Sequence, residues 1–141
     1  MPEQLPCILL IDDNPDDNYL HKRVILKAGV ADKVEVAYNG EEALRMLGLL
    51  GDDTGSSIVI PQLILLDLNM PGMDGWEFLK HYSRLAADQK SATSIVVVSS
   101  SENPEDLEMA KNNPLVKGVI HKPLDTEKLT ELVTNYLEGK F

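Results

Sequence analysis

Short apolar runs recur along the chain and are separated by segments with helical periodicity. The runs lie at Cys7–Ile11, Leu63–Leu66, Ile95–Val98 and Val116–Ile120, and the first three are almost wholly apolar. Runs of this length and composition predict parallel strands that helices cover on both faces. A weaker run, Lys33–Tyr38, alternates apolar and polar residues, which predicts a strand at the edge of the sheet.

The segments between these runs carry the start signals of helices. Asparagine before proline predicts a helix whose cap is the asparagine and whose first residue is the proline. An Asn or Asp followed three residues later by Glu resembles a capping box. The predicted helix starts are Asn14–Pro15, Asn39 with Glu42, Asp74 with Glu77, and Asn103–Pro104.

Two of the predicted helices also show an apolar face. The last has a regular stripe, and in the first helix Leu20, Val24 and Ala28 form a row with Ile25 beside it, while Leu26 falls off that face. The stripe of the last helix consists of Leu129, Leu132, Val133, Tyr136 and Leu137.

The order of the elements predicts the fold. Strands and helices alternate five times, which favours an α/β protein with an open, five-stranded parallel sheet, right-handed crossovers and helices on both faces. For five strands, the order 2-1-3-4-5 is expected. Residues 1–141 are interpreted as one domain without an output domain, and the glycine- and serine-containing segment Leu49–Pro61 as a flexible surface connection.

Composition excludes several classes of function. The formal net charge of −10 argues against nucleic acid and anionic membranes as partners, since both attract clustered Lys and Arg. The single cysteine, Cys7, excludes an intrachain disulfide. The sequence shows neither a secretory signal at its start nor an apolar run of the roughly 20 residues that a membrane span needs. A cytoplasmic protein is therefore expected.

Polar residues follow the predicted strands at their carboxyl ends, which is where α/β sheets bind their ligands. Asp12 and Asp13 follow the first run, Asp67 the third strand, Ser99 the fourth and Lys122 the fifth. Each residue alone is common in turns and helix caps. Their joint occurrence at the ends of the right strands favours a functional site.

Three gathered carboxylates require a cation. At about 4 Å and an effective dielectric constant of about 20, each pair repels by about 4 kcal/mol, and three such pairs rival the stability of a whole domain. Oxygen ligands without His or Cys select a hard ion, so Mg²⁺ is expected, with Mn²⁺ as a second candidate. Lys122 supplies a fixed positive charge.

A carboxylate beside Mg²⁺ and a lysine can act as a nucleophile toward phosphorus and form an acyl phosphate. Asp67 is the expected nucleophile because it projects from the central strand, whereas Asp12 and Asp13 are better placed as metal ligands. The metal and Lys122 would stabilise charge on the phosphoryl oxygens, and the Ser99 hydroxyl could donate a hydrogen bond to one of them.

At this point the chain resembles, over essentially its full length, the receiver domains of two-component response regulators, which have the flavodoxin-like fold. The segments that carry the resemblance are ILLIDDNPDD at 8–17, LILLDLNMPGMDG at 63–75, IVVVSSS at 95–101 and VIHKPLD at 119–125.

The resemblance implies a role for each residue of the predicted site. Asp67 would be the phosphoacceptor, and Ser99 and Lys122 would hold the positions of the family's conserved hydroxyl residue and lysine. The lysine precedes Pro123, whose peptide bond is usually cis in this family. The metal ligands would be Asp12, Asp13, Asp67 and the backbone carbonyl of Asn69.

The resemblance also implies partners. These are a sensor histidine kinase, a downstream protein target, and a second copy of the chain as a further candidate, with signalling through the face of the fourth helix, fifth strand and fifth helix. The chain would catalyse its own phosphotransfer and dephosphorylation without being a conventional enzyme.

Two features depart from most receivers. Val119 stands where many have a Tyr or Phe that rotates inward on activation. The stretch before the third strand is longer than usual, and with NPDDNYL at 14–20 it is similar to single-domain regulators found beside phytochrome-like sensor kinases.

Two other functions remain as alternatives. An aspartyl phosphatase of the haloacid-dehalogenase type would carry its nucleophile after the first strand in an Asp-x-Asp pattern, which this chain lacks there. A degenerate receiver acting as an adaptor would not use phosphate, and the intact set of Asp13, Asp67, Ser99 and Lys122 speaks against it. No phosphate-binding glycine-rich motif of a nucleotide-binding protein occurs. His21 and His121 are interpreted as surface residues and Trp76 as a packing residue.

Overall fold

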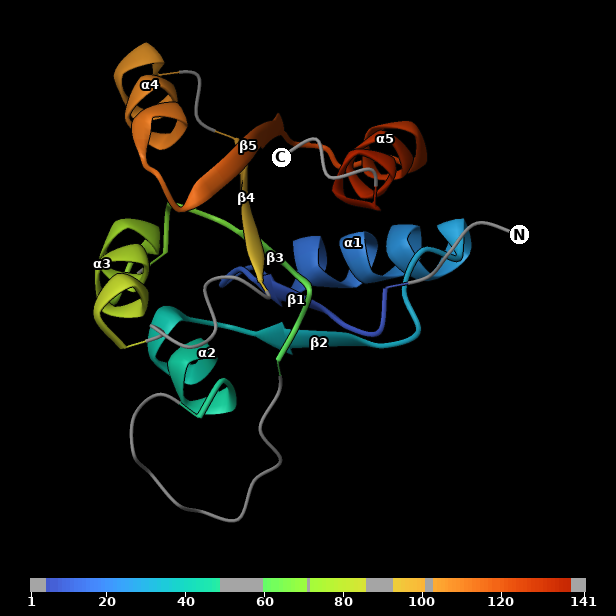
Figure 1. The fold of residues 1–141 in the computed structure, drawn as a ribbon, viewed down its shortest axis with the longest axis horizontal. Helices are drawn as coiled ribbons and strands as arrows, with labels where there is room; N and C mark the ends of the chain where they lie inside the picture. The colour runs from blue at the N-terminus through green and yellow to red at the C-terminus, as the bar shows by residue number, and fades with distance from the viewer. Residues whose placement is uncertain (1–4, 49–59, 71, 86–92, 101–102, 138–141) are drawn as a thin grey trace.

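The computed structural model describes residues 5–48, 60–70, 72–85, 93–100 and 103–137, and in these ranges five strands alternate with five helices (Figure 1). The strands are β1 (Ile8–Ile11), β2 (Val34–Ala37), β3 (Leu63–Leu66), β4 (Ser94–Ser99) and β5 (Val116–His121). The helices are α1 (Pro15–Ala28), α2 (Gly40–Met46), α3 (Gly75–Leu85), α4 (Pro104–Asn112) and α5 (Thr126–Leu137).

The strands form one parallel sheet in the order β2-β1-β3-β4-β5, which confirms the predicted order. The alternating strand β2 lies at one edge, as its pattern predicts, and β5 forms the other edge. In the centre, Ile11 of β1 is in register with both Ala37 of β2 and Leu66 of β3. The residues that follow these three therefore emerge side by side at the carboxyl edge.

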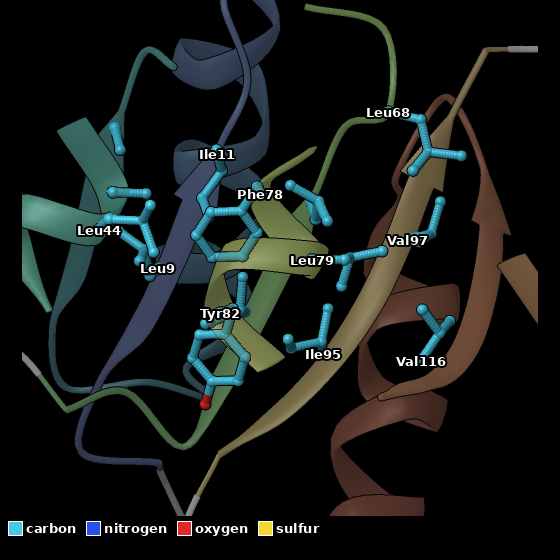
Figure 2. Close-up of a cluster of buried hydrophobic side chains, with 14 of the residues drawn as sticks. Leu9, Ile11, Leu44, Leu68, Phe78, Leu79, Tyr82, Ile95, Val97 and Val116 are labelled. Carbon is cyan, nitrogen blue, oxygen red and sulfur yellow. The ribbon is translucent and has the colours of Figure 1, made fainter. Parts of the chain in front are cut away.

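Helices cover both faces of the sheet, with α2, α3 and α4 on one face and α1 and α5 on the other (Figure 1). Successive residues of the central strands point to opposite faces, so that Leu9 and Ile11 belong to one core cluster and Ile8 and Leu10 to the other. Figure 2 shows the first cluster, in which Phe78, Leu79 and Tyr82 of α3 pack against the sheet. The long apolar strands are thus buried on both faces, as expected.

The predicted capping residues begin their helices as expected. The Asn14 side chain accepts hydrogen bonds from the backbone of Asp16 and Asp17 at 2.9 and 3.2 Å, with Pro15 in the first helical position. The other three caps accept from the backbone two or three residues later: Asn39 from Glu42, Asp74 from Glu77 and Asn103 from Glu105.

The apolar face predicted for α1 is confirmed except at Leu20. Ile25 is buried, Val24 and Ala28 pack partly buried against the core, and Leu26 is exposed as predicted. Leu20 is 55% exposed, and the residues of α1 that are buried are Asn18, His21 and Ile25. The interpretation of His21 as a surface residue is therefore wrong, whereas His121 is exposed as predicted. The helix is rotated so that a polar row faces inward near the predicted site. The hydrophobic pattern does not reveal this rotation, because apolar residues are expected on the inward face of a helix.

The remaining fold predictions concern α5 and one connection. In α5, Leu129, Leu132 and Val133 are buried as predicted, whereas Leu137 is 40% exposed, so the stripe ends before the last residue. Of the predicted connection Leu49–Pro61, residues 49–59 lie outside the described ranges. Among the helices of the described residues, none is long and apolar enough to cross a membrane.

Candidate functional site

The predicted site residues stand at the carboxyl edge of the sheet, either at the last position of a strand or one to three residues beyond it. The backbone N–H of Asp12 donates to β2 at 3.1 Å, that of Asp67 to β1 at 2.9 Å, and that of Lys122 to β4 at 2.9 Å. Each residue is thus held by a backbone hydrogen bond to the neighbouring strand. The sheet therefore fixes the positions of these side chains.

Three carboxylates gather at this edge. Asp12, Asp13 and Asp67 each offer an oxygen atom, and these atoms lie within 4.8 Å of one another. Asp12 and Asp67 are only 4% and 5% exposed, while Asp13 lies closer to solvent. The structure thus brings together the three acids that the sequence places at the ends of two different strands.

One ammonium group faces these acids. Lys122 Nζ lies 2.8 Å from Asp12 Oδ2 and 3.6 Å from Asp67 Oδ2. It also donates a hydrogen bond to Asp17 Oδ2 at 2.8 Å. The Lys122 side chain is only 14% exposed, so these contacts are largely shielded from water.

The pKa values of two groups reflect this arrangement. Burial, and then the charge of Asp12, raise the pKa of Asp67 to about 6, although Lys122 and the backbone N–H of Asn69 favour its ionised form. For Lys122, burial lowers the pKa, but hydrogen bonds to Asp12 and Asp17 and the charge of Asp67 outweigh it, so that the pKa is raised. Lys122 is therefore a permanent cation, and Asp67 carries its negative charge at a cost.

The donor set fits a hard divalent cation. Three carboxylates, with three negative charges when ionised, face the single positive charge of Lys122, and burial together with the charge of Asp12 raises the pKa of Asp67. All three donors are oxygen atoms, which Mg²⁺ prefers. The arrangement thus lacks positive charge, which a bound divalent cation would supply.

Close packing fixes the loop that follows Asp67. The backbone N–H of Gly75 donates to the Leu68 carbonyl at 3.0 Å. A Cβ atom at position 75 would stand 2.6 Å from Leu68 Cα and 2.7 Å from the Asp67 carbonyl oxygen, so only glycine fits without a backbone shift. Asn69 is exposed, and its N–H donates to Asp67 Oδ1 at 3.2 Å. The start of α3 therefore supports the loop that carries Asp67.

The other predicted residues have defined places. Ser99 is fully buried as the last residue of β4, and its carbonyl accepts the Lys122 N–H.

Val119 is half-buried on β5 and, with Lys128 and other residues of β5 and α5, lines a surface cavity of about 560 Å³. The Lys122–Pro123 peptide bond is cis, as the resemblance implies. Trp76 packs against the core, which confirms its interpretation as a packing residue.

Asp17, for which the sequence motifs indicate no role, contacts Lys122. Asp17 and His21 are four residues apart on α1 and therefore lie on one face of the helix, next to buried Asn18. His21 has a lowered pKa because of burial and the charge of Lys122. The polar residues Asp17, Asn18 and His21, at positions i, i+1 and i+4, are the sequence pattern that could have indicated this inward face. The apolar residues Leu20 and Val24 pointed to a different face of the helix.

Comparison with known proteins identifies the family. The sequence-family model of the response regulator receiver domain matches residues 8–134 of the chain. The chain belongs to this family. The probable methanogenesis regulatory protein FilR2 of Methanothrix harundinacea is 32% identical over 131 residues, which are 93% of this chain and 81% of that protein.

Solved structures agree with this assignment. A two-component response regulator from Cytophaga hutchinsonii superposes with a TM-score of 0.82 at 27% identity, covering 96% of this chain and 98% of that one. The bacteriophytochrome response regulator AtBRR superposes with a TM-score of 0.76 at 30% identity, covering 96% and 94%. This second match agrees with the similarity to regulators beside phytochrome-like kinases.

Some relatives are longer than the matched region. The nitrate/nitrite response regulator NarL of Escherichia coli is 33% identical over 141 residues, and the chain spans 59% of its length. The part that all these proteins share with the chain is the receiver domain. The chain is therefore a receiver domain of two-component phosphorelay signalling.

Proposed function

We propose that this receiver accepts a phosphoryl group on Asp67 from a sensor histidine kinase, with Mg²⁺ bound beside it. The observation that carries the proposal is the position of the Asp67 carboxylate, which is buried, 3.6 Å from the Lys122 ammonium and grouped with two further carboxylates. A strand end supports each of these residues, so the arrangement is preorganised.

The proposed transfer is a displacement at phosphorus. An Asp67 oxygen forms a bond to phosphorus while the bond from phosphorus to the kinase histidine nitrogen breaks, and the nitrogen keeps the electron pair. Lys122 donates a hydrogen bond to one phosphoryl oxygen, and the Ser99 hydroxyl to another. Hydrolysis of the acyl phosphate by water later restores the Asp67 carboxylate.

The metal would be held by carboxylate oxygens of Asp12, Asp13 and Asp67 and by the backbone carbonyl of Asn69. When bound, Mg²⁺ supplies positive charge that stabilises the transferring phosphoryl oxygens. Mn²⁺, which accepts the same oxygen donors, is a second candidate. Without a divalent cation, a dianionic phosphoryl group would be added beside three carboxylates that face only the one positive charge of Lys122.

Incubation with acetyl phosphate and Mg²⁺ is expected to add one phosphoryl group, which intact-mass spectrometry detects. The addition should disappear with a chelator and in Asp67→Asn, which keeps the size of the side chain but loses its nucleophilic charge. Asp74→Asn, a change of a carboxylate outside the cluster, should be labelled like the unchanged protein. Equal labelling of Asp67→Asn would place the nucleophile elsewhere.

Mg²⁺ is expected to raise the melting temperature, because a ligand that binds only the folded state stabilises it by about 2.7 kcal/mol at 100 times its Kd. Asp13→Ala should abolish this increment, and Asp16→Ala, which removes an exposed acid nearby, should retain it. Thermal unfolding with and without Mg²⁺ measures the effect. An equal increment in all three proteins would exclude Asp13 as a ligand.

The proposed partners follow from this chemistry. They are the sensor histidine kinase, a downstream protein target and, as a further candidate, a second copy of the chain. The net charge of −10 argues against nucleic acid and anionic membranes as partners. The face of α4, β5 and α5 stays the predicted contact surface. We further propose a cytoplasmic location, residues 1–141 as one domain, and no conventional enzymatic activity, so that the chain turns over no aryl phosphate.

A further inference from the structure

The Lys122 ammonium is hydrogen-bonded to two carboxylates, and neither is the proposed phosphoacceptor. Its Nζ lies 2.8 Å from Asp12 Oδ2 and 2.8 Å from Asp17 Oδ2. The separation of 3.6 Å from Asp67 Oδ2 is an ion-pair contact that exceeds hydrogen-bond length. In the unphosphorylated protein, Lys122 is therefore held mainly by the residue that follows β1 and by a residue of α1.

Asp17 is held in place by the start of α1. It lies in the first helical turn, where its N–H donates to the capping side chain of Asn14 at 3.2 Å. A carboxylate is favourable in this turn because it faces the positive end of the helix dipole. The backbone thus fixes the direction from which Asp17 reaches Lys122.

The two hydrogen-bonded carboxylates differ in their exposure to water. The side chain of Asp12 is 6% exposed and that of Asp17 is 32% exposed. A buried carboxylate that loses its cation is left uncompensated, whereas a partly exposed one regains hydration. Of the two partners, Asp17 is the one that Lys122 can release at the lower cost.

A phosphoryl group on Asp67 would compete for the same cation. Lysine has three N–H donors, and Asp12 and Asp17 engage two of them. Hydrogen bonds between an ammonium and a phosphoryl oxygen are strong and depend on close approach. The negative charge of Asp17 also repels an incoming phosphoryl dianion. Both effects of Asp17 therefore weaken phosphoryl binding.

We propose that Asp17 is a positioning residue that holds Lys122 in the unphosphorylated state and competes with the phosphoryl group for it. On phosphorylation, Lys122 exchanges the Asp17 carboxylate for a phosphoryl oxygen, and Asp17 becomes hydrated. Asp12 remains hydrogen-bonded to Lys122 or turns to the metal. This inference rests on the proposed function, since it takes Asp67 as phosphoacceptor and Lys122 as the phosphoryl-binding cation.

The first test measures binding of beryllofluoride, a phosphoryl mimic, to the Mg²⁺-saturated protein. Asp17→Asn is expected to bind it about tenfold more tightly, because the competing charged hydrogen bond is lost. The matched control is Asp16→Asn, which removes a charge in the same helical turn without touching Lys122, and should change affinity by about twofold or less. An equal effect of both variants would overturn the inference.

A double-mutant cycle separates competition for Lys122 from simple charge removal. In a Lys122→Met background, the effect of Asp17→Asn should fall to that of Asp16→Asn. If Asp17→Asn tightens binding about tenfold in this background as well, Asp17 acts without Lys122 and the inference is wrong. If Asp17→Asn tightened binding only by changing the stability of α1, its effect would also persist in this background and would contradict the inference.

The contact itself can be observed without metal or phosphate. The ammonium protons of Lys122 should exchange slowly with water in nuclear magnetic resonance spectra of the metal-free protein, and faster in Asp17→Asn but not in Asp16→Asn. Unchanged exchange in Asp17→Asn would overturn the inference. A protein that shows this difference but neither binds beryllofluoride nor becomes phosphorylated would instead contradict the proposed function, and with it the exchange of partners.

Discussion

Lys122→Met is expected to destabilise the metal-free protein by about 3 kcal/mol at pH 7, the lower end of the cost of breaking a buried ion pair. Methionine keeps the aliphatic stem but removes the positive charge that lies 2.8 Å from Asp12 and 3.6 Å from Asp67. Both carboxylates are nearly inaccessible to water, so solvent cannot replace the lost ammonium. The free energy of unfolding in urea with a chelator measures the effect.

Two comparisons sharpen this expectation. Lys117→Met removes an exposed charge from β5, the strand that precedes Lys122, and should change the stability by less than about 0.5 kcal/mol. The loss in Lys122→Met should shrink below pH 6, because protonation of Asp67 removes one of the uncompensated charges. A loss that is independent of pH would indicate that Lys122 stabilises through packing and not through its charge.

The fold could be predicted from the sequence because two kinds of evidence agree. Continuous apolar runs such as Leu63–Leu66 identify strands buried on both faces, and caps such as Asn14 identify where the helices begin. The positions of Asp12, Asp67 and Lys122 follow from the same evidence, since each stands just beyond a strand and parallel strands align their carboxyl ends.

The contacts made by α1 could not be predicted in the same way. Periodicity assigns Leu20 to the core, yet Leu20 is exposed, and Asn18 and His21 are buried near the site. Asn18 Nδ2 donates to the Asp12 carbonyl at 2.7 Å, and Asp17 contacts Lys122, which lies 105 residues away in the sequence. A window of neighbouring residues contains no information about such a distant cation.

Asp67→Asn is expected to stabilise the metal-free protein by about 3 kcal/mol at pH 7.5 or about 10 °C in melting temperature. Burial and the charge of Asp12 raise the pKa of Asp67 from 3.8 to about 6. Between these values the folded state binds more protons than the unfolded state, so the contribution of Asp67 to stability is lost as the pH rises through this window. Asparagine resembles the protonated carboxyl group and avoids the loss.

Urea unfolding in the presence of a chelator, between pH 4 and pH 7.5, tests this expectation. The advantage of Asp67→Asn should vanish toward pH 4, where both proteins are uncharged at this position, and Asp16→Asn should show no such dependence. Asp67→Asn should also restore part of the stability lost in Lys122→Met, because the two changes act on one pair of charges. An advantage that persists at pH 4 would show that the change acts through packing. If the advantage of Asp67→Asn appears as the pH rises from about 4 to about 6, the ionised Asp67 carboxylate destabilises the metal-free fold. A cation bound beside Asp67 would then offset this loss of stability.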